Sequence, residues 1–246
     1  MCIRWAGTTQ PARKSLWSRS RSVRLVLCTF FGLALIALSP ATRLGAEQPW
    51  PVLLREDFQM GAPRWQPFDP TVWRIESDGE NFYYSQYRKD TSYKPPHRSP
   101  LLISLLQQPV VTDFDLRVRV KSTHPDYGHR DCCIVFGYQD AAHFYYVHLG
   151  KQTDDHANQI FVVDGAPRVK ISTQTSAGTP WDEKWHWVRV VRHTQDGSIT
   201  VYFDDMDQPV MKAIDRRFLH GRIGVGSFDD TSAWDDIELR GIEYSP

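Results

Sequence analysis

The stretch HFYYVHLGKQTDDHANQIFVVDG, residues 143–165, decides the fold class of this chain. Both of its ends are rich in aromatic and β-branched side chains, whereas the residues between them are polar. This arrangement is typical of two β-strands joined by a loop. The Asp-Gly pair at 164–165 is a strong hairpin signal, because glycine accepts the positive φ that a tight turn requires. The stretch therefore predicts antiparallel strands over 143–150 and 158–165.

The same pattern recurs along the rest of the chain, where Gly, Pro, Asp and Asn separate short apolar or alternating runs and a helical period is almost absent. Segment 92–100, SYKPPHRSP, contains three prolines and is expected to be a loop. Strands are expected at 52–58, 73–77, 81–87, 100–106, 113–122, 133–139, 143–150, 158–165, 167–173, 186–193, 198–205, 221–228 and 234–244. So many short strands predict an all-β fold, a two-sheet antiparallel jelly-roll β-sandwich.

The N-terminal segment has the parts of a secretory signal peptide. Residues 1–46 carry seven Lys or Arg and no acid, and the apolar run LVLCTFFGLALIAL occupies 25–38. A stable membrane span needs about 20 apolar residues, so the run favours cleavage, after Ala41 or Ala46, over the alternative of a retained anchor. The chain is therefore expected to be exported, to the periplasm or outside the cell, as one domain over 47–246.

Charge and cysteine usage narrow the function classes. The chain has 29 basic and 29 acidic residues, so 47–246 has 29 − 7 = 22 basic residues against 29 acidic ones, a net charge of −7. Such a surface repels phosphate backbones, which excludes nucleic acid as an expected partner. Cys132 and Cys133 are neighbours on one predicted strand and are expected to point to opposite faces, one buried and one half-exposed, without pairing.

Four segments together carry a family resemblance: IVFGYQDAAHFYYVHL, WHWVRVVR, GSITVYFDD and GRIGVGSFDDTSAWDDIEL. They resemble the concanavalin-A-like lectin/glucanase superfamily, in particular its laminin-G-like members and secreted bacterial domains allied to 3-keto-disaccharide hydrolases. The resemblance covers residues 52–241. It implies one concave sheet whose face or rim takes an extended carbohydrate. The Glu-x-Asp-x-x-Glu ladder of the superfamily's endoglucanases is absent, which argues against two-carboxylate glycosidase chemistry.

The resemblance also implies a structural calcium where the first strand meets the last. The matching positions are Glu56, Asp57 and Asp236. Calcium takes six to eight oxygen ligands, and the alternative is that these side chains are only surface acids on edge strands. No other cofactor is expected.

Alternation along the opening stretch assigns its faces. Phe144, Tyr146 and His148 are expected on the outer face, with Asn158 or Ile160 as the neighbour of His148 on the facing strand. The residues expected to face the core are Tyr145, Val147, Leu149, Phe161 and Val163.

The outer face and its rim supply the candidate site residues. Histidine can act as an acid or base near neutral pH, and aromatic rings stack on sugars. The catalytic candidates are His148, His156 and Tyr146. The substrate-binding candidates are Tyr84, His129, Asn158, Arg168, Lys170 and Trp181, of which Tyr84 and Trp181 are expected to be exposed. The alternative for the His and Tyr residues is a half-exposed sheet face without a function.

Three functions follow from these features. The first is an exported domain that binds a polysaccharide or oligosaccharide on its concave sheet. The second is a carbohydrate-active enzyme, a glycosidase of the 3-keto-disaccharide hydrolase type or a polysaccharide lyase, with His148 or His156 as base and Tyr146 or Lys170 as partner. The third is a laminin-G-type module that binds proteins.

Overall fold

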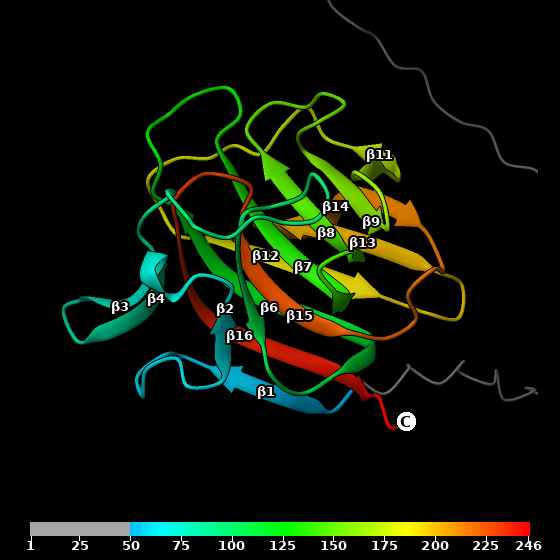
Figure 1. Cartoon of the computed structure of the whole chain (residues 1–246), viewed down its shortest axis with the longest axis horizontal. Helices are drawn as coiled ribbons and strands as arrows, with labels where there is room; N and C mark the ends of the chain where they lie inside the picture. Colours follow the sequence, from blue (N-terminus) through cyan, green and yellow to red (C-terminus); the bar gives the residue numbers. More distant parts are fainter. Residues whose placement is uncertain (1–49) are drawn as a thin grey trace, which may run out of the picture. The chain divides into compact units, whose positions relative to one another are not determined.

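Two antiparallel β-sheets pack face to face around one main apolar core (Figure 1). This computed structural model describes residues 50–246, so the predicted signal peptide lies outside the described residues. The all-β, two-sheet antiparallel sandwich expected from the sequence is confirmed. Within residues 50–246, no helix is long and apolar enough to cross a membrane.

The larger sheet has nine strands. In order across the sheet these are β11 (Ser172–Thr175), β14 (Asp205–Ile214), β13 (Ser198–Phe203), β12 (His186–Arg192), β6 (Val111–Ser122), β16 (Ser232–Glu243), β4 (Asn81–Gln86) and β3 (Trp73–Asp78), with β1 (Val52–Glu56) also paired to β16. The long strands β6 and β16 form its centre and are antiparallel to each other.

The smaller sheet has seven strands. In order these are β10 (Val169–Lys170), β9 (Gln159–Asp164), β8 (His143–Gly150), β7 (Asp131–Asp140), β15 (Arg222–Ser227), β5 (Leu102–Leu106) and β2 (Trp65–Pro67). A short 3-10 turn, η1 (Pro70–Val72), leads from β2 into β3, with the Asp69 side chain accepting a hydrogen bond from the Thr71 amide.

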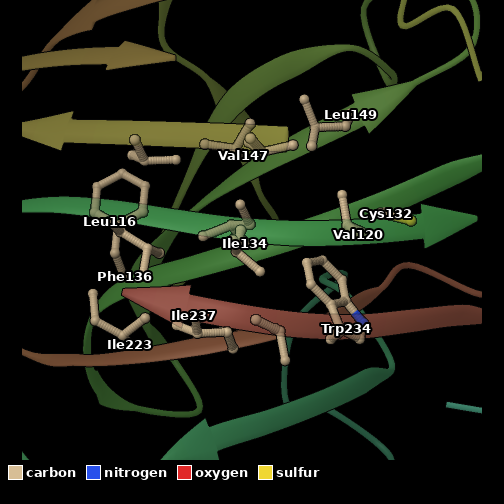
Figure 2. Close-up of a cluster of buried hydrophobic side chains, with 14 of the residues drawn as sticks. Leu116, Val120, Cys132, Ile134, Phe136, Val147, Leu149, Ile223, Trp234 and Ile237 are labelled. Atoms are coloured by element: carbon tan, nitrogen blue, oxygen red, sulfur yellow. The ribbon is translucent and has the colours of Figure 1, made fainter. Parts of the chain in front are cut away.

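The main core lies between the sheets and follows the period-two alternation of the strands. Figure 2 shows Leu116 and Val120 of β6 in the same cluster as Ile134 of β7 and Val147 of β8. Trp234 of β16 is the largest fully buried side chain. Burial of each such side chain stabilises the fold by about 1.5–3 kcal/mol.

A second apolar cluster lies on the outer face of the seven-stranded sheet. Phe68 and Phe228 pack against it. Residues 87–101, which connect β4 to β5 and which we call the covering segment, extend along this side. Its Tyr93 ring lies 4.6 Å from the Phe68 ring, and its Arg98 carbonyl accepts a hydrogen bond from the Arg168 amide. This segment is the proline-rich loop expected from the sequence, and the sheet beside it is buried on both faces.

The register of the opening hairpin corrects part of the face assignment. Tyr146 pairs with Phe161, and Phe144 with Val163. Directly paired residues share a face, so Phe161 and Val163 point outward, and the expectation that they face the main core was wrong. His148 pairs with Gln159, one position from either expected neighbour. A shift of one residue exchanges the two faces of a strand.

Some of the other sequence-based expectations are confirmed and some are wrong. Gly165 and Gly197 have φ of 63° and 80°, as the Asp-Gly turns require. Cys132 and Cys133 are unpaired and lie in the two different clusters as expected, but both are buried, because the outer face of the sheet is covered. The expected strand 167–173 is two short strands in different sheets, and β2 and β14 were not expected.

Candidate functional site

His148 was expected on an open face and is instead buried, with 4% of its surface exposed. Its Nδ1 accepts a hydrogen bond from the Asn158 amide at 3.2 Å, and its Nε2 lies 3.6 Å from Asp131 Oδ2. Because Nδ1 is an acceptor, the proton of the neutral ring is on Nε2. Burial is the main cause that lowers the pKa of His148 to about 3. The ring is a neutral, enclosed group at neutral pH.

Asp131 is the centre of this buried network. Its Oδ2 accepts hydrogen bonds from the Phe228 amide at 2.8 Å and from the Cys133 thiol at 3.3 Å. Burial and the nearby Asp230 carboxylate raise the pKa of Asp131 to about 8. Burial also raises the pKa of the Cys133 thiol well above its usual value, so the thiol stays protonated and is no nucleophile.

Tyr146 is enclosed in the same way and has no exposed surface. Its hydroxyl accepts a hydrogen bond from Arg168 Nη1 at 2.7 Å. The Arg168 guanidinium lies over the rings of Phe161 and Phe228, at 4.5 and 4.4 Å from their centroids. Its Nη2 donates to the carbonyl oxygen of His156. These contacts hold the Arg168 side chain against the outer cluster.

Asn158 is fully buried and joins two loops. Its Nδ2 donates to Thr153 Oγ1 at 2.7 Å, and its Oδ1 accepts from Thr179 Oγ1 at 3.0 Å. It adopts a positive φ of 55°, which asparagine tolerates better than most residues. The amide is engaged within the fold rather than presented to a ligand.

Tyr84 and Trp181 were expected to be exposed, and this was wrong: 4% and 5% of their surfaces are exposed. Tyr84 stacks on Trp73 with ring centroids 4.5 Å apart, and its hydroxyl contacts Ser104 Oγ at 3.0 Å. The Trp181 indole nitrogen donates to the Leu149 carbonyl oxygen at 2.7 Å. Both rings belong to the main core, where their polar atoms have partners.

The remaining candidates His129, His156 and Lys170 lie on the surface. His129 is 3.6 Å from Asp154, and Lys170 forms an ion pair with Asp155. His156 is also exposed. The structure therefore separates exposed candidates on loops and on β10 from the buried pair His148 and Tyr146, and it does not bring them together as one open site.

An open polar face is found on the nine-stranded sheet. Because Val118 and Val188 point into the core, Arg117 and Trp187 point outward from the paired strands β6 and β12. A cavity of about 660 Å³ opens on this face. Its lining residues are Arg55, Glu56, Asp57, Arg117, Trp187, Val188, Asp204, Met206, Asp236, Ile237 and Glu238.

Ion pairs organise the charged side chains of the cavity. Glu238 accepts hydrogen bonds from Arg55 Nε at 2.8 Å and from Arg240 Nε at 2.6 Å. These two arginines hold the pKa of Glu238 below its usual value. Asp236 contacts Arg119 Nη1 at 2.6 Å. Both carboxylates are therefore held in fixed positions by arginine side chains.

Trp187 is the aromatic residue of this cavity, with 42% of its surface exposed. Its amide donates to Asp204 Oδ1 at 2.9 Å. Asp204 Oδ2 lies 2.8 Å from His186 Nδ1, and Asp182 Oδ1 lies 3.0 Å from His186 Nε2. The buried imidazole thus joins the two loops beside the tryptophan.

Trp187 is not among the sequence-based candidates, although a signal for it was present. The alternation in WHWVRVVR places Trp185 and Trp187 on the face opposite to Val188 and Val190. Trp187 is exposed, and Trp185 is half-buried on the same outer face, against Tyr83 with ring centroids 5.4 Å apart.

The three residues matched to calcium, Glu56, Asp57 and Asp236, line this one cavity. Their assignment as calcium ligands stays a prediction. Asp236 is already paired with Arg119, and within residues 50–246 the only groups of three close metal-ligand atoms lie elsewhere, around Asp131. The positive charge of the Arg119 guanidinium beside Asp236 would repel a divalent cation bound there.

No family model matches the chain, and no curated protein matches it in sequence. Many solved structures are similar in fold, among them two proteins from Bacillus subtilis. A carbohydrate-binding module, CBM66 from Bacillus subtilis, aligns with a TM-score of 0.51 and 16% identity, over 72% of this chain and 96% of that one. A Bacillus subtilis protein of unknown function with a galectin-like fold aligns with a TM-score of 0.53 and 9% identity, over 80% and 99%. At these identities, the likeness is one of β-sandwich fold alone.

Proposed function

We propose that this chain is an exported carbohydrate-binding domain that holds an oligosaccharide or polysaccharide in the cavity of the nine-stranded sheet. The observation that carries the proposal is the exposed Trp187 ring beside Arg117 and Glu238 in one preformed cavity. An indole ring stacks on the apolar face of a sugar, while guanidinium and carboxylate groups bond its hydroxyls. The fold likeness to a carbohydrate-binding module agrees with this function, and the signal-like segment 1–46 supports export.

Replacing Trp187 by alanine is expected to weaken glycan binding by about tenfold or more, because stacking and ring burial are both lost. Binding is measured by calorimetry on glycans selected from a polysaccharide array. Phe82→Ala is the matched control, since Phe82 is 41% exposed and does not line the cavity. Equal binding by wild type and Trp187→Ala, with unchanged melting temperatures, would place the glycan elsewhere. New reducing or unsaturated ends in the incubated glycan would identify an enzyme instead.

A further inference from the structure

We infer that the cavity selects sugars with a free amino group over neutral sugars, and rejects uronates. The inference rests on the proposed function and concerns the same site. It follows from the charges that line the cavity, from their pairing, and from the exposed indole.

The lining of the cavity has more carboxylates than cations. The cations are Arg55 and Arg117. The carboxylates are Glu56, Asp57, Asp204, Asp236 and Glu238. The formal sum of the lining is 2 − 5 = −3, and with Arg119 and Arg240, which pair with Asp236 and Glu238, it is −3 + 2 = −1, on a domain that itself has a net charge of −7 over 47–246. A cavity of one sign raises the local concentration of ligands of the opposite sign.

Pairing identifies which of these carboxylates remain available. Glu238, Asp236 and Asp204 each face Arg or His partners. The Glu56 carboxylate accepts a hydrogen bond from the Phe58 amide at 3.3 Å, and the Asp57 carboxylate accepts one from the Gln59 amide at 3.2 Å. Neither has an ion-pair partner among residues 50–246. Each keeps one carboxylate oxygen for a ligand donor.

Trp187 adds a second attraction for a cation. An ammonium group near the face of an indole is attracted by the ring quadrupole, and tryptophan is the best of the aromatic residues in this role. The Arg117 side chain is half-exposed, and its Nε lies 4.0 Å from Asp115 Oδ1, which is too far for a hydrogen bond. Its guanidinium is therefore available to bond sugar hydroxyls. The cavity thus combines an aromatic platform, a hydroxyl-binding arginine and two unpaired acids, which matches an amino sugar.

Three tetrasaccharides test the inference by calorimetry: fully deacetylated chitotetraose, its N-acetylated form, and tetragalacturonate. The first two share length and linkage and differ in the ammonium group. We expect the deacetylated form to bind about tenfold more tightly than the acetylated one, because two exposed ion pairs together contribute about that much. Tetragalacturonate is expected to bind most weakly. The preference should decrease as sodium chloride is raised, because salt screens exposed charges.

The double variant Glu56→Gln/Asp57→Asn keeps both backbone hydrogen bonds and removes two charges. It should lower the ratio of the two affinities toward one, because binding of the deacetylated form loses the most. Glu80→Gln/Asp90→Asn removes two exposed charges that do not line the cavity and should keep the preference.

Equal affinity for both chitotetraose forms, or tighter binding of tetragalacturonate, would overturn this inference and leave the proposed function standing. If no glycan bound, either on the polysaccharide array or among the three tetrasaccharides, the proposed function would be rejected as well. Tighter binding of a lysine-rich peptide than of any sugar would also overturn it, in favour of a protein partner.

Discussion

Gly226→Ala is expected to destabilise the domain by about 4 kcal/mol or more, and to leave little folded protein. Gly226 lies in β15, between Ile103 of β5 and Cys133 of β7. A Cβ atom at this position would lie 1.8 Å from the Leu102 carbonyl oxygen, which belongs to the backbone and cannot rotate away. This close approach of the two backbones explains why glycine occupies the position.

Urea denaturation and soluble yield measure this effect. Gly128→Ala is the control, because the nearest atom to an added Cβ is the terminal Oε1 of the Gln152 side chain, at 3.0 Å, which can move. A Gly226→Ala protein as stable as Gly128→Ala would show that β15 and β5 are not so close.

Stability is expected to fall by about 1 kcal/mol between pH 6.5 and pH 8 because of Asp131. Its pKa rises from 3.8 to about 8 on folding, so above pH 3.8 the unfolded chain loses a proton that the folded one keeps. That term lowers stability as the pH rises, until pH 8. The pKa of His148 falls from 6.5 to about 3, which lowers stability as the pH falls from 6.5 to 3. The two slopes oppose each other between pH 3.8 and 6.5. Above pH 6.5 the His148 contribution fades and the Asp131 contribution, at most about 1.4 kcal/mol per pH unit, dominates.

Asp131→Asn should remove this alkaline loss. The neutral amide can accept from the Phe228 amide with its oxygen and face Ser227 Oγ with its nitrogen. The free energy of unfolding is measured in urea at pH 6.5 and pH 8. Asp229→Asn, at an exposed neighbouring carboxylate, should retain the wild-type loss. The same loss in Asp131→Asn as in wild type would assign it to other groups.

Local sequence pattern was sufficient for the fold class and for most strands. Period-two alternation and Asp-Gly turns are short-range signals, and β6, β8 and β12 follow them closely. Strand β14 was missed because its sequence, DMDQPVMKAI, begins with acids and contains Pro209, which removes a ladder donor. Pro209 lies beside an irregularity in the pairing of β13 with β14, where a proline is tolerated.

The site was harder to predict because it depends on long-range packing. Nothing near His148 or Tyr146 in sequence indicates that their face is covered, since Phe68 and Phe228 come from distant segments. Conversely, Trp187 and Glu56 lie 131 positions apart in sequence and meet in one cavity only through the pairing of β1, β16, β6 and β12. Residue type alone can nominate aromatic and acidic side chains, and tertiary structure decides which of them face solvent.

Strands β7 and β8 of the seven-stranded sheet are buried on both faces and form the middle layer of the domain. Seven of the eight residues of β8 are buried, and the first eight residues of β7 are. Their backbone amides are shielded by the main core on one side and by the outer cluster on the other. Amide hydrogen exchange in β7 and β8 should therefore require global unfolding, whereas amides of the thinly covered outer strand β11 should exchange through local opening.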